Sequence, residues 1–329
     1  MAGVAAQTAI LDVCQRFFTA PNVGTAMATD ETVTVDGTTL HYLEAGNPSD
    51  PTVVLLHGGV IDAARVSWAP VIEPLAEDCH VLAVDLLGYG ESVTARNGLE
   101  ENERERSDTR VGESDLPPGP YPVSRHVDAI EGFAEALSLN DPTVAGLSLG
   151  GAVGLGLALR RPGLVEDLLL IDSYGLGREL PNGLLSYALA RVQVCNKVAI
   201  ALFRRSRRFT KASLDGIVAD LDALSEDAVD AVFEEVQRPT AGVAFRRFRS
   251  AEVTRDGYRT VFVDDLPDLQ VPTRLLHGSE DEVVPLAWAE RAADRIPESE
   301  LVVLDDCAHW PPREAPETVV QHVREIAHR

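Results

Sequence analysis

Short apolar runs alternate with amphipathic segments through most of this 329-residue chain. Val53–Leu56 is continuously apolar, as expected of a strand that is buried on both faces. Similar runs follow at 81–84, 144–145, 168–171, 273–276 and 301–304. Helices are predicted between them at 70–76, 123–137, 149–160, 286–295 and 316–327. This alternation predicts an α/β fold with a mostly parallel, eight-stranded sheet flanked by helices.

The first two strands depart from that alternation. Val33–Val35 and Leu40–Leu43 flank Asp36-Gly37, a pair typical of a hairpin turn. The sheet should therefore be antiparallel at one edge. We assign residues 31–175 and 262–329 to this core.

Residues 176–261 lie between two predicted strands and are expected to be helical throughout. They contain an apolar stripe at three- and four-residue steps, and Ser225–Val236 predicts a further helix. An insertion at this point should cover one end of the sheet as a helical cap, or lid. The stripe consists of Leu185, Leu189, Val192, Cys195, Ala199, Leu202 and Phe203.

Two other segments are expected outside the core. Residues 1–30 have apolar positions at helical spacing and no secretion signal, which predicts a helical extension and a cytoplasmic protein. Residues 95–120 are rich in Glu, Arg, Gly and Pro, which predicts a charged, flexible loop. No run reaches the roughly 20 apolar residues that a membrane span needs.

The charge of the chain is strongly negative. Asp and Glu number 52 against 29 Lys and Arg, for a formal net charge of -23, and only Lys197 and Lys211 are lysines. A polyanion such as nucleic acid would be repelled. The composition is similar to that of cytoplasmic proteins of salt-loving archaea, in which concentrated cations screen dense carboxylates, so we expect a halophilic protein.

The four cysteines, Cys14, Cys79, Cys195 and Cys307, include no C-x-x-C pair. We therefore expect reduced, mostly buried thiols, with neither a zinc site nor a disulfide framework. Cys307 is two residues from His309, but adjacent positions at the end of a strand rarely converge on one atom.

A G-x-S-x-G pattern is formed by Gly146-Leu147-Ser148-Leu149-Gly150. A predicted strand precedes it and a predicted helix follows it, which is the context of a nucleophile elbow. The turn should lift the Ser148 hydroxyl above the sheet edge and point the N-terminus of the helix at the same place. Ser148 is thus the candidate nucleophile.

A second motif, His57-Gly58-Gly59-Val60, ends an early strand. A backbone N–H of this motif should form an oxyanion hole together with the N–H of Leu149. The donor is expected to be Gly59 or Val60, and we prefer Gly59. We expect His57 to hold the turn by hydrogen bonding, and His57 and Gly58 to lie at the substrate pocket.

The last two strands end at His277–Pro285 and at Asp305–Pro311. Neighbouring parallel strands end at the same edge, so Asp281 and His309 can meet Ser148 there. His309 is the candidate base, Asp281 the acid that orients it, and Trp310 a pocket residue. The rival acids are Glu280, Glu282 and Asp172, the last also at the end of a strand.

Together these motifs, with Asp85–Ser92, resemble the α/β-hydrolase superfamily, in its serine-nucleophile, lid-bearing branch. The similarity spans roughly 33–174 and 266–329. It implies a triad of Ser148, Asp281 and His309, and a non-catalytic turn shaped by four residues of the Asp85–Ser92 motif. These residues are Asp85, Gly88, Gly90 and Ser92.

The residues at and just before the nucleophile differ from those of some family members, and these differences narrow the range of reactions that we expect. Epoxide hydrolases and haloalkane dehalogenases of the family carry an aspartate nucleophile, which Ser148 excludes. Members that cleave carbon–carbon bonds usually have Asn before the serine, whereas this chain has Leu147.

We expect a carboxylesterase-like serine hydrolase that cleaves an ester or related acyl bond of a small, largely apolar substrate through an acyl-enzyme, without cofactor or metal. Within the fold, the alternatives are a cofactor-free haloperoxidase or perhydrolase, an acyltransferase and a C–C bond hydrolase. Outside enzymes, the alternative is a ligand-binding receptor with vestigial hydrolysis. A basic run at 191–211 could attract an anionic substrate, but we interpret it as a solvated face. The sequence does not predict the oligomeric state.

Overall fold

The computed structural model describes residues 28–94, 112–180, 183, 187 and 193–329. Eight strands form one continuous path in the order β1-β2-β4-β3-β6-β7-β10-β11, and the short strand β5 pairs with β2. The pairs β1/β2 and β2/β4 are antiparallel, and the later pairs are parallel. This confirms the predicted α/β fold with a mixed edge. The strands are β1 (Thr29–Val35), β2 (Thr38–Ala45), β3 (Thr52–Leu56), β4 (His80–Val84), β5 (Val93–Thr94), β6 (Thr143–Leu147), β7 (Leu168–Ile171), β10 (Thr273–Gly278) and β11 (Ser299–Leu304).

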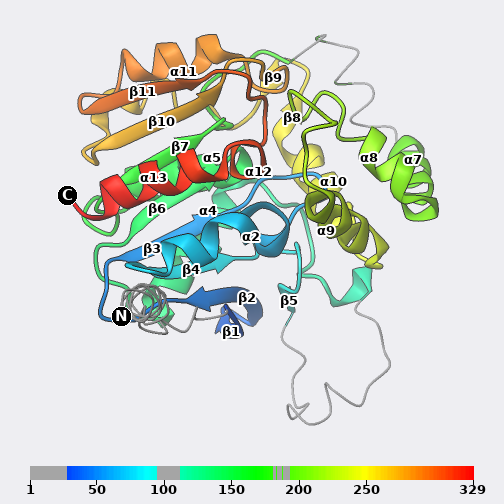
Figure 1. Ribbon diagram of the computed structural model, residues 1–329, viewed down its shortest axis with the longest axis horizontal. Coiled ribbons are helices and arrows are strands. Elements are labelled where there is room, and N and C mark those ends of the chain that lie inside the picture. The colour runs from blue at the N-terminus through cyan, green and yellow to red at the C-terminus, as the bar shows by residue number, and fades with distance from the viewer. Residues whose placement is uncertain (1–27, 95–111, 181–182, 184–186, 188–192) are drawn as a thin grey trace, which may run out of the picture.

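Helices cover both faces of the sheet (Figure 1). On one face are α4 (Val123–Ala136), α5 (Leu149–Arg160) and α11 (Leu286–Ala293); on the other are α2 (Ala64–Leu75) and α13 (Pro316–Ala327). Because side chains alternate along a strand, β3 serves both cores. Val54 and Leu56 face the first group of helices, and Val53 and Leu55 face the second.

The strand order creates a switch point beside β3. From β3 the chain moves to β4 on one side, and it then crosses to β6 on the other side. In open α/β sheets, ligands bind outside the carboxyl ends of the strands at such a point. The described end of β6 is followed directly by Ser148.

Helix α2 begins at Ala64, six residues before the predicted start at Pro70, so that prediction was wrong at its N-terminal boundary. Proline favours a first turn, but both Pro70 and Pro74 lie inside this helix. Pro70 has no N–H to give to the carbonyl of Val66. Arg313 supplies the missing donor, because its Nε lies 2.6 Å from Val66 O.

The region between β7 and β10 lies at one end of the sheet (Figure 1). Its described elements are α7 (Gln193–Arg205), α8 (Arg207–Ala212), α9 (Glu226–Gln237), α10 (Val243–Glu252) and the hairpin β8 (Val253–Thr254)–β9 (Gly257–Tyr258). The prediction that it is helical throughout was wrong. Residues 255–256 form the hairpin turn, and Gly257 directly after it has a φ of +117°, which suits glycine. Thr254 Oγ1 donates to Gly257 O.

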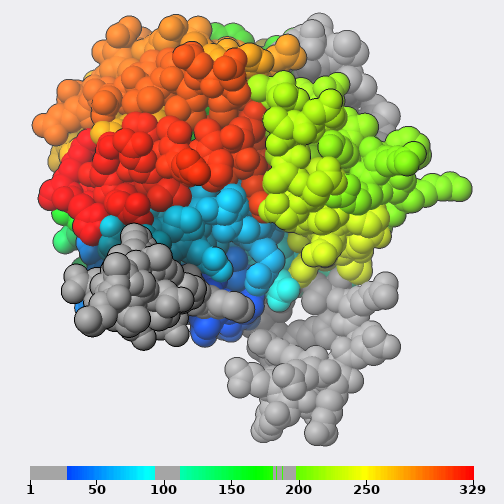
Figure 2. All heavy atoms as spheres, viewed as in Figure 1, coloured from blue at the N-terminus to red at the C-terminus, as the bar shows by residue number. Residues whose placement is uncertain are grey.

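This inserted region packs against the core rather than standing apart from it. Figure 2 shows its yellow-green atoms lying against the red atoms of the C-terminal segment, which includes α12 (Pro311–Glu314). Arg313 of that helix forms an ion pair with Asp227 of α9, with Nη1 2.9 Å from Oδ2. Arg313 therefore joins the insertion to both α12 and α2.

Several predictions fall on residues outside the described ranges. They include the helical extension up to residue 27, residues 95–111 of the charged loop, and three residues of the apolar stripe, Leu185, Leu189 and Val192. Of that loop, residues 112–120 are described: Pro117 O accepts a hydrogen bond from the Tyr121 hydroxyl, and Glu113 pairs with Arg246. Among the cysteines whose side chains are described, Cys79 and Cys307 are free and buried, as predicted. No helix in the described part of the chain is long and apolar enough to cross a membrane.

Candidate active site

Ser148 occupies a sharp turn between β6 and α5. Its φ of 50° and ψ of -111° lie outside the regions that side chains favour, which is typical of functional turns. The turn requires glycine on both sides. A Cβ on Gly146 would lie 2.4 Å from Gly150 C, and a Cβ on Gly150 would lie 2.2 Å from Leu56 O. The spacing G-x-S-x-G thus follows from the close approach of β6, α5 and β3.

The Ser148 hydroxyl meets an imidazole and a carboxylate from the ends of two later strands. Ser148 Oγ lies 3.0 Å from His309 Nε2, and His309 Nδ1 lies 2.7 Å from Asp281 Oδ2. The Asp281 side chain is fully buried, and its other oxygen accepts hydrogen bonds from the N–H groups of Val283 and Val284. These contacts fix the carboxylate and thereby the orientation of the ring.

Asp172, the principal rival acid, is next to this relay but does not bond to His309. Its Oδ1 accepts from the Gly278 N–H at 2.9 Å, and its buried Oδ2 has no hydrogen-bond partner. Burial and the nearby Asp281 raise the pKa of Asp172 well above its usual value. The raised pKa favours the neutral form of the Asp172 carboxyl. The other rivals, Glu280 and Glu282, are exposed.

His277 is a second buried imidazole in the same neighbourhood. Its Nε2 lies 2.9 Å from Val284 O, which makes this nitrogen the donor, and its Nδ1 lies 3.5 Å from Asp172 Oδ1. Burial lowers the pKa of His277, so the ring is neutral near pH 7. It packs behind Asp281 and bonds to the same short loop.

The turn after β3 is held by two buried polar side chains. His57 Nε2 accepts from the Leu86 N–H at 2.9 Å, and its Nδ1 lies 2.8 Å from Gly58 O. Asp62 accepts from the N–H groups of Gly58 and Ala63 and from the Ser67 hydroxyl. His57 is fully buried and does not line the cavity described below, whereas Gly58 does.

The three residues expected to supply oxyanion-hole N–H groups, Leu149, Gly59 and Val60, lie near Ser148 on two elements. Leu149 begins α5, so its N–H is one of the free donors at the positive end of the helix. Gly59 and Val60 come from the turn after β3, and all three residues line the cavity. Val60 has a φ of 63°, which is strained for a β-branched residue. Phe245 of α10 packs over Gly59, with ring carbons 3.2 Å from a Cβ placed there.

The loop that carries His309 is held from both sides. Glu314 accepts from the N–H groups of Ala308 and Trp310, and the N–H of His309 donates to Ile217 O in the insertion at 2.9 Å. The Trp310 indole N–H donates to Ser67 Oγ. The insertion therefore helps to position the candidate base.

A cavity of about 370 Å³ opens beside the Ser148 hydroxyl. Its walls are mostly apolar and aromatic and come from both the core and the insertion. Arg249 of α10 also lines it, with its guanidinium carbon 5.5 Å from the centre of the Phe245 ring. Burial lowers the pKa of Arg249, although an arginine remains charged near pH 7. The apolar lining includes Leu147, Tyr174, Leu214, Val232, Phe248 and Trp288.

One group of possible metal ligands lies in this site. Asp172, Asp281 and His309 each offer an atom within 4.8 Å of the others. His309 Nδ1 already faces Asp281, so an ion between them would displace the bond that orients the ring.

Several residues that shape the site were missed in the sequence. Asp62, Glu314 and His277 are buried polar groups whose partners are mostly backbone atoms. Their only signal was nearness to a motif, since Asp62 follows the His57 turn and Glu314 follows His309. Arg249 had none, because it belongs to a helix in the insertion.

Three features together define an α/β hydrolase. They are the order of the strands in the sheet, the nucleophile elbow at Ser148, and the hydrogen bonds that link Ser148, His309 and Asp281. The chain belongs to the Alpha/beta hydrolase family, whose sequence model matches residues 53–322.

Among its relatives are enzymes named for dienoate substrates. It is 29% identical over 290 residues to 2-hydroxy-6-oxo-6-(2'-aminophenyl)hexa-2,4-dienoic acid hydrolase of Metapseudomonas resinovorans, covering 87% of this chain and 86% of that protein. It is 29% identical over 276 residues to 2-hydroxy-6-oxo-2,4-heptadienoate hydrolase of Pseudomonas putida, covering 83% and 86%.

The fold is similar to that of solved hydrolase structures. 2-Hydroxy-6-oxo-6-phenylhexa-2,4-dienoate hydrolase from Rhodococcus sp. strain RHA1 aligns with a TM-score of 0.72 over 92% of this chain and all of that chain. The identity is 24%, so this likeness supports the fold alone.

Proposed function

We propose that this protein is a serine hydrolase that cleaves an ester of a small, largely apolar carboxylic acid through an acyl-enzyme. The observation that carries the proposal is the continuous relay from Ser148 Oγ through His309 to Asp281, with separations of 3.0 and 2.7 Å, at the wall of an apolar cavity. A nucleophile, a base within hydrogen-bond reach and an oriented acid are the requirements for acyl transfer.

In the first step, Ser148 Oγ attacks the ester carbonyl carbon while His309 Nε2 takes its proton. The carbonyl oxygen becomes an oxyanion, which the N–H groups of Leu149 and of Gly59 or Val60 would hold. Collapse of this intermediate breaks the bond to the alcohol oxygen, and that oxygen takes the proton from His309. The products are the free alcohol and an acyl ester on Ser148.

In the second step, His309 takes a proton from water as the water oxygen attacks the acyl carbon. The bond to Ser148 Oγ then breaks, and Oγ recovers its proton from His309. The carboxylic acid leaves and the resting state is restored. Through both steps, Asp281 would stabilise the imidazolium and keep the proton on Nδ1.

We propose that the insertion at 176–261 acts as a lid that selects the substrate. Its described residues supply much of the cavity wall, including Phe203, Leu214, Val236 and Phe248. A cavity of this size and lining suits an acyl or alcohol group of a small organic molecule. Water excluded by this wall would also strengthen the electrostatic contacts around the oxyanion.

A second candidate is hydrolysis of a carbon–carbon bond in a 2-hydroxy-6-oxo-dienoate. Two relatives at 29% identity carry names of this kind, and such substrates bear a carboxylate. Arg249 offers a cation in the wall of the cavity for that group. Leu147, where carbon–carbon hydrolases usually have Asn, weighs against this candidate.

One experiment separates the two candidates. The purified chain is assayed in high salt against p-nitrophenyl esters from acetate to octanoate and, in parallel, against 2-hydroxy-6-oxohepta-2,4-dienoate. We expect ester turnover with an optimum at intermediate acyl length. Turnover of the dienoate with a much larger kcat/KM would favour the second candidate.

The control is Ser148→Ala together with a fluorophosphonate probe. The wild-type protein should be labelled once, at Ser148, and the variant should be neither labelled nor active. An unlabelled wild-type protein that is folded in the same buffer would remove both candidates, because both require a nucleophilic serine.

A further inference from the structure

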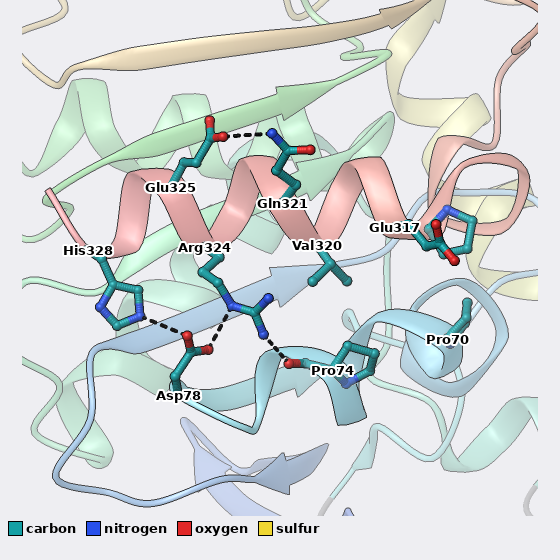
Figure 3. Close-up of a pocket in the computed structure, with 10 residues that line it drawn as sticks. Pro70, Pro74, Asp78, Glu317, Val320, Gln321, Arg324, Glu325 and His328 are labelled. Carbon is teal, nitrogen blue, oxygen red and sulfur yellow. Dashed lines mark hydrogen bonds and ion pairs between the residues drawn. The ribbon is translucent and has the colours of Figure 1, made fainter.

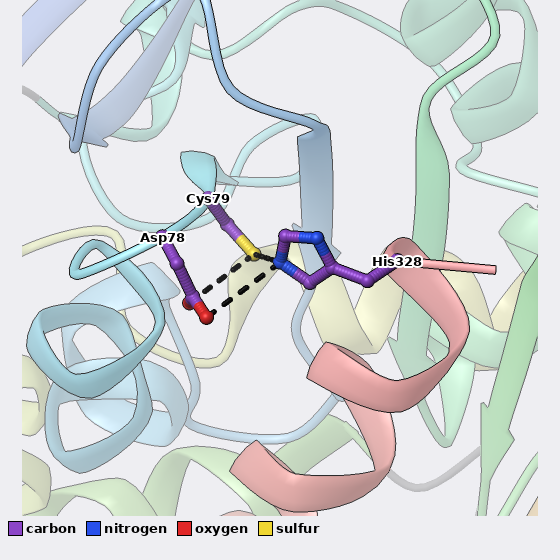
Figure 4. Close-up of side chains that lie close together, drawn as sticks. All are labelled: Asp78, Cys79 and His328. Atoms are coloured by element: carbon purple, nitrogen blue, oxygen red, sulfur yellow. Dashed lines mark hydrogen bonds and ion pairs between the residues drawn. The ribbon is translucent and has the colours of Figure 1, made fainter.

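Three side chains of types that bind metals meet far from the catalytic cavity. Asp78 and Cys79 lie in the turn between α2 and β4, and His328 caps the C-terminal end of α13. Figure 4 shows the imidazole of His328 pointing at both of the others. Cys79 Sγ lies 3.7 Å from His328 Nε2 and 3.8 Å from Asp78 Oδ1, and His328 Nε2 lies 3.6 Å from Asp78 Oδ2.

Although the cysteine spacing predicted no zinc site, we propose that Asp78, Cys79 and His328 form one. Ligand atoms at about 2.0–2.3 Å from Zn²⁺ in a tetrahedron lie roughly 3.4–3.6 Å from one another. The observed separations use both oxygens of Asp78, Oδ1 towards Cys79 and Oδ2 towards His328. With one atom taken from each residue, the three ligand atoms lie within 4.8 Å of one another. One ion can therefore contact all three residues after small side-chain rotations.

The donor set favours zinc over the hard cations. A thiolate and an imidazole are soft to borderline ligands, which suit Zn²⁺ and Co²⁺, whereas Mg²⁺ and Ca²⁺ prefer oxygen. With three protein ligands, the fourth tetrahedral position is left for water. The site is separate from the proposed function, because none of its residues lines the catalytic cavity.

The carboxylate of Asp78 is held in place by a neighbouring arginine. Arg324 Nε donates to Asp78 Oδ1 at 2.9 Å, and Arg324 Nη2 donates to Pro74 O at 2.5 Å. Hydrogen bonds of this kind orient metal-binding carboxylates. Arg324 is itself 3.7 Å from Glu77 Oε2, which offsets its positive charge beside the ion.

An open groove between α2 and α13 gives an ion access to the site. Asp78, Arg324 and His328 line this groove of about 810 Å³, and Figure 3 shows Arg324 and His328 bonded across it to Asp78. Cys79 is fully buried beneath the turn, whereas the His328 side chain is 39% exposed. A bound ion would join residues 249 positions apart and fasten the end of α13 to the turn.

Cobalt titration tests this proposal on the full-length, tag-free chain after treatment with a chelator. We expect one equivalent of Co²⁺ to produce the near-ultraviolet charge-transfer band of a cobalt–thiolate bond, and one equivalent of Zn²⁺ to abolish it. Cys79→Ser should remove the band. His328→Gln and Asp78→Asn should weaken binding at least tenfold, since each removes a ligand.

Matched controls separate the site from other thiols and histidines. Cys307→Ser and His322→Gln, the latter on the same helix α13, should bind Co²⁺ like the wild type. Zn²⁺ should raise the melting temperature of the wild type and of His322→Gln, but not that of His328→Gln. Because His328 is partly exposed, its replacement should leave the fold intact, and far-ultraviolet circular dichroism checks this.

Two outcomes overturn the proposal: a cobalt band that survives in Cys79→Ser, or the absence of the band from the wild type. Neither outcome bears on the labelling of Ser148.

Discussion

Two buried carboxyl groups, Asp281 and Asp172, lie side by side at the candidate active site, and their surroundings give them different roles. Asp281 lies 2.7 Å from the His309 ring and accepts hydrogen bonds from two backbone N–H groups. Asp172 has one N–H partner and an unpartnered oxygen, and its pKa is raised. Sequence position alone could not distinguish them, because both follow strands that end at the same edge.

The first prediction compares amide replacements of these two residues. Asp281→Asn should lower kcat by about four orders of magnitude, because the ring loses its orienting charge. Asp172→Asn should keep kcat within the same order of magnitude as the wild type, since an amide resembles a protonated carboxyl and can still accept from the Gly278 N–H. Steady-state kinetics on a p-nitrophenyl ester measures both. Equal losses in the two variants would contradict the assignment of the acid.

Glu235 of α9 supports a second prediction, about pH. Burial raises the pKa of Glu235 to about 8, against the opposing attraction of Arg238. A carboxyl whose folded pKa lies above its unfolded value stabilises the protein fully below the unfolded pKa of 4.5. This contribution is lost as pH rises from about 4.5 to about 8.

Glu235→Gln should therefore stabilise the protein at high pH. The expected gain above pH 8 is on the order of a few kcal/mol, because each pH unit between the unfolded and the folded pKa contributes about 1.4 kcal/mol. The gain should vanish near pH 4.5, where both states carry the proton. Urea unfolding at several pH values measures it. Glu234→Gln, on the exposed neighbour, is the control and should show no such pH-dependent gain.

At the scale of elements, Glu252 connects the end of α10 to the core. It is fully buried and accepts hydrogen bonds from the Val123 N–H, the Tyr174 hydroxyl and both donors of Thr260. Val123 starts α4 and Tyr174 follows β7. One carboxylate therefore joins the insertion to two core elements.

The third prediction concerns this junction. Glu252→Gln should destabilise the protein by about 2–4 kcal/mol, because an amide NH₂ would face N–H and O–H donors that lose their acceptor. Urea unfolding at pH 7 measures the loss. The exposed Glu298→Gln is the matched control and should change stability by less than about 0.5 kcal/mol. A similar result for both variants would mean that Glu252 does not anchor the insertion.

Much of the core could be predicted from the sequence, because its strands are buried on both faces and so appear as short apolar runs. Val53–Leu56 and Leu168–Ile171 are examples, and the helices at 149–160 and 316–327 have the predicted bounds. Predictions from local sequence were wrong where a residue far along the chain determines the local structure. Pro70 sits inside α2 because Arg313, more than 240 positions later, satisfies the freed carbonyl.

The candidate site could be predicted only in part, because some of its residues are held by groups that are distant in the sequence. Ser148, Asp281 and His309 stand in motifs with characteristic neighbours, and the structure brings them together. The groups that hold them, such as Asp62 and Glu314, bond mainly to backbone atoms. Backbone partners leave no sequence pattern.

At the scale of the whole molecule, the net charge of -23 gives the fourth prediction. Carboxylates on one surface repel each other, and salt shortens the range of that repulsion from about 10 Å at 0.1 M to about 3 Å at 1 M. We expect the melting temperature to rise by several degrees between 0.1 and 2 M KCl. Scanning calorimetry measures the rise.

The control for this prediction is sucrose at equal osmolality, which stabilises folded proteins by exclusion from their surface and not by screening. Sucrose should have the smaller effect. A melting temperature that stays unchanged in KCl would remove the halophilic interpretation of the composition.

The backbone hydrogen bond from His309 to Ile217 connects the candidate base to the insertion as well as to the core. A second bond, from the Ala219 N–H to Glu314, ties the same stretch to the histidine loop. If the segment from Ile217 to Ala219 moves away from the core to admit a substrate, the His309 N–H loses its hydrogen bond to Ile217 O while the segment is displaced. The protein should then be inactive while the insertion is open and active only after it closes. Product release, which requires reopening, would be the rate-limiting step.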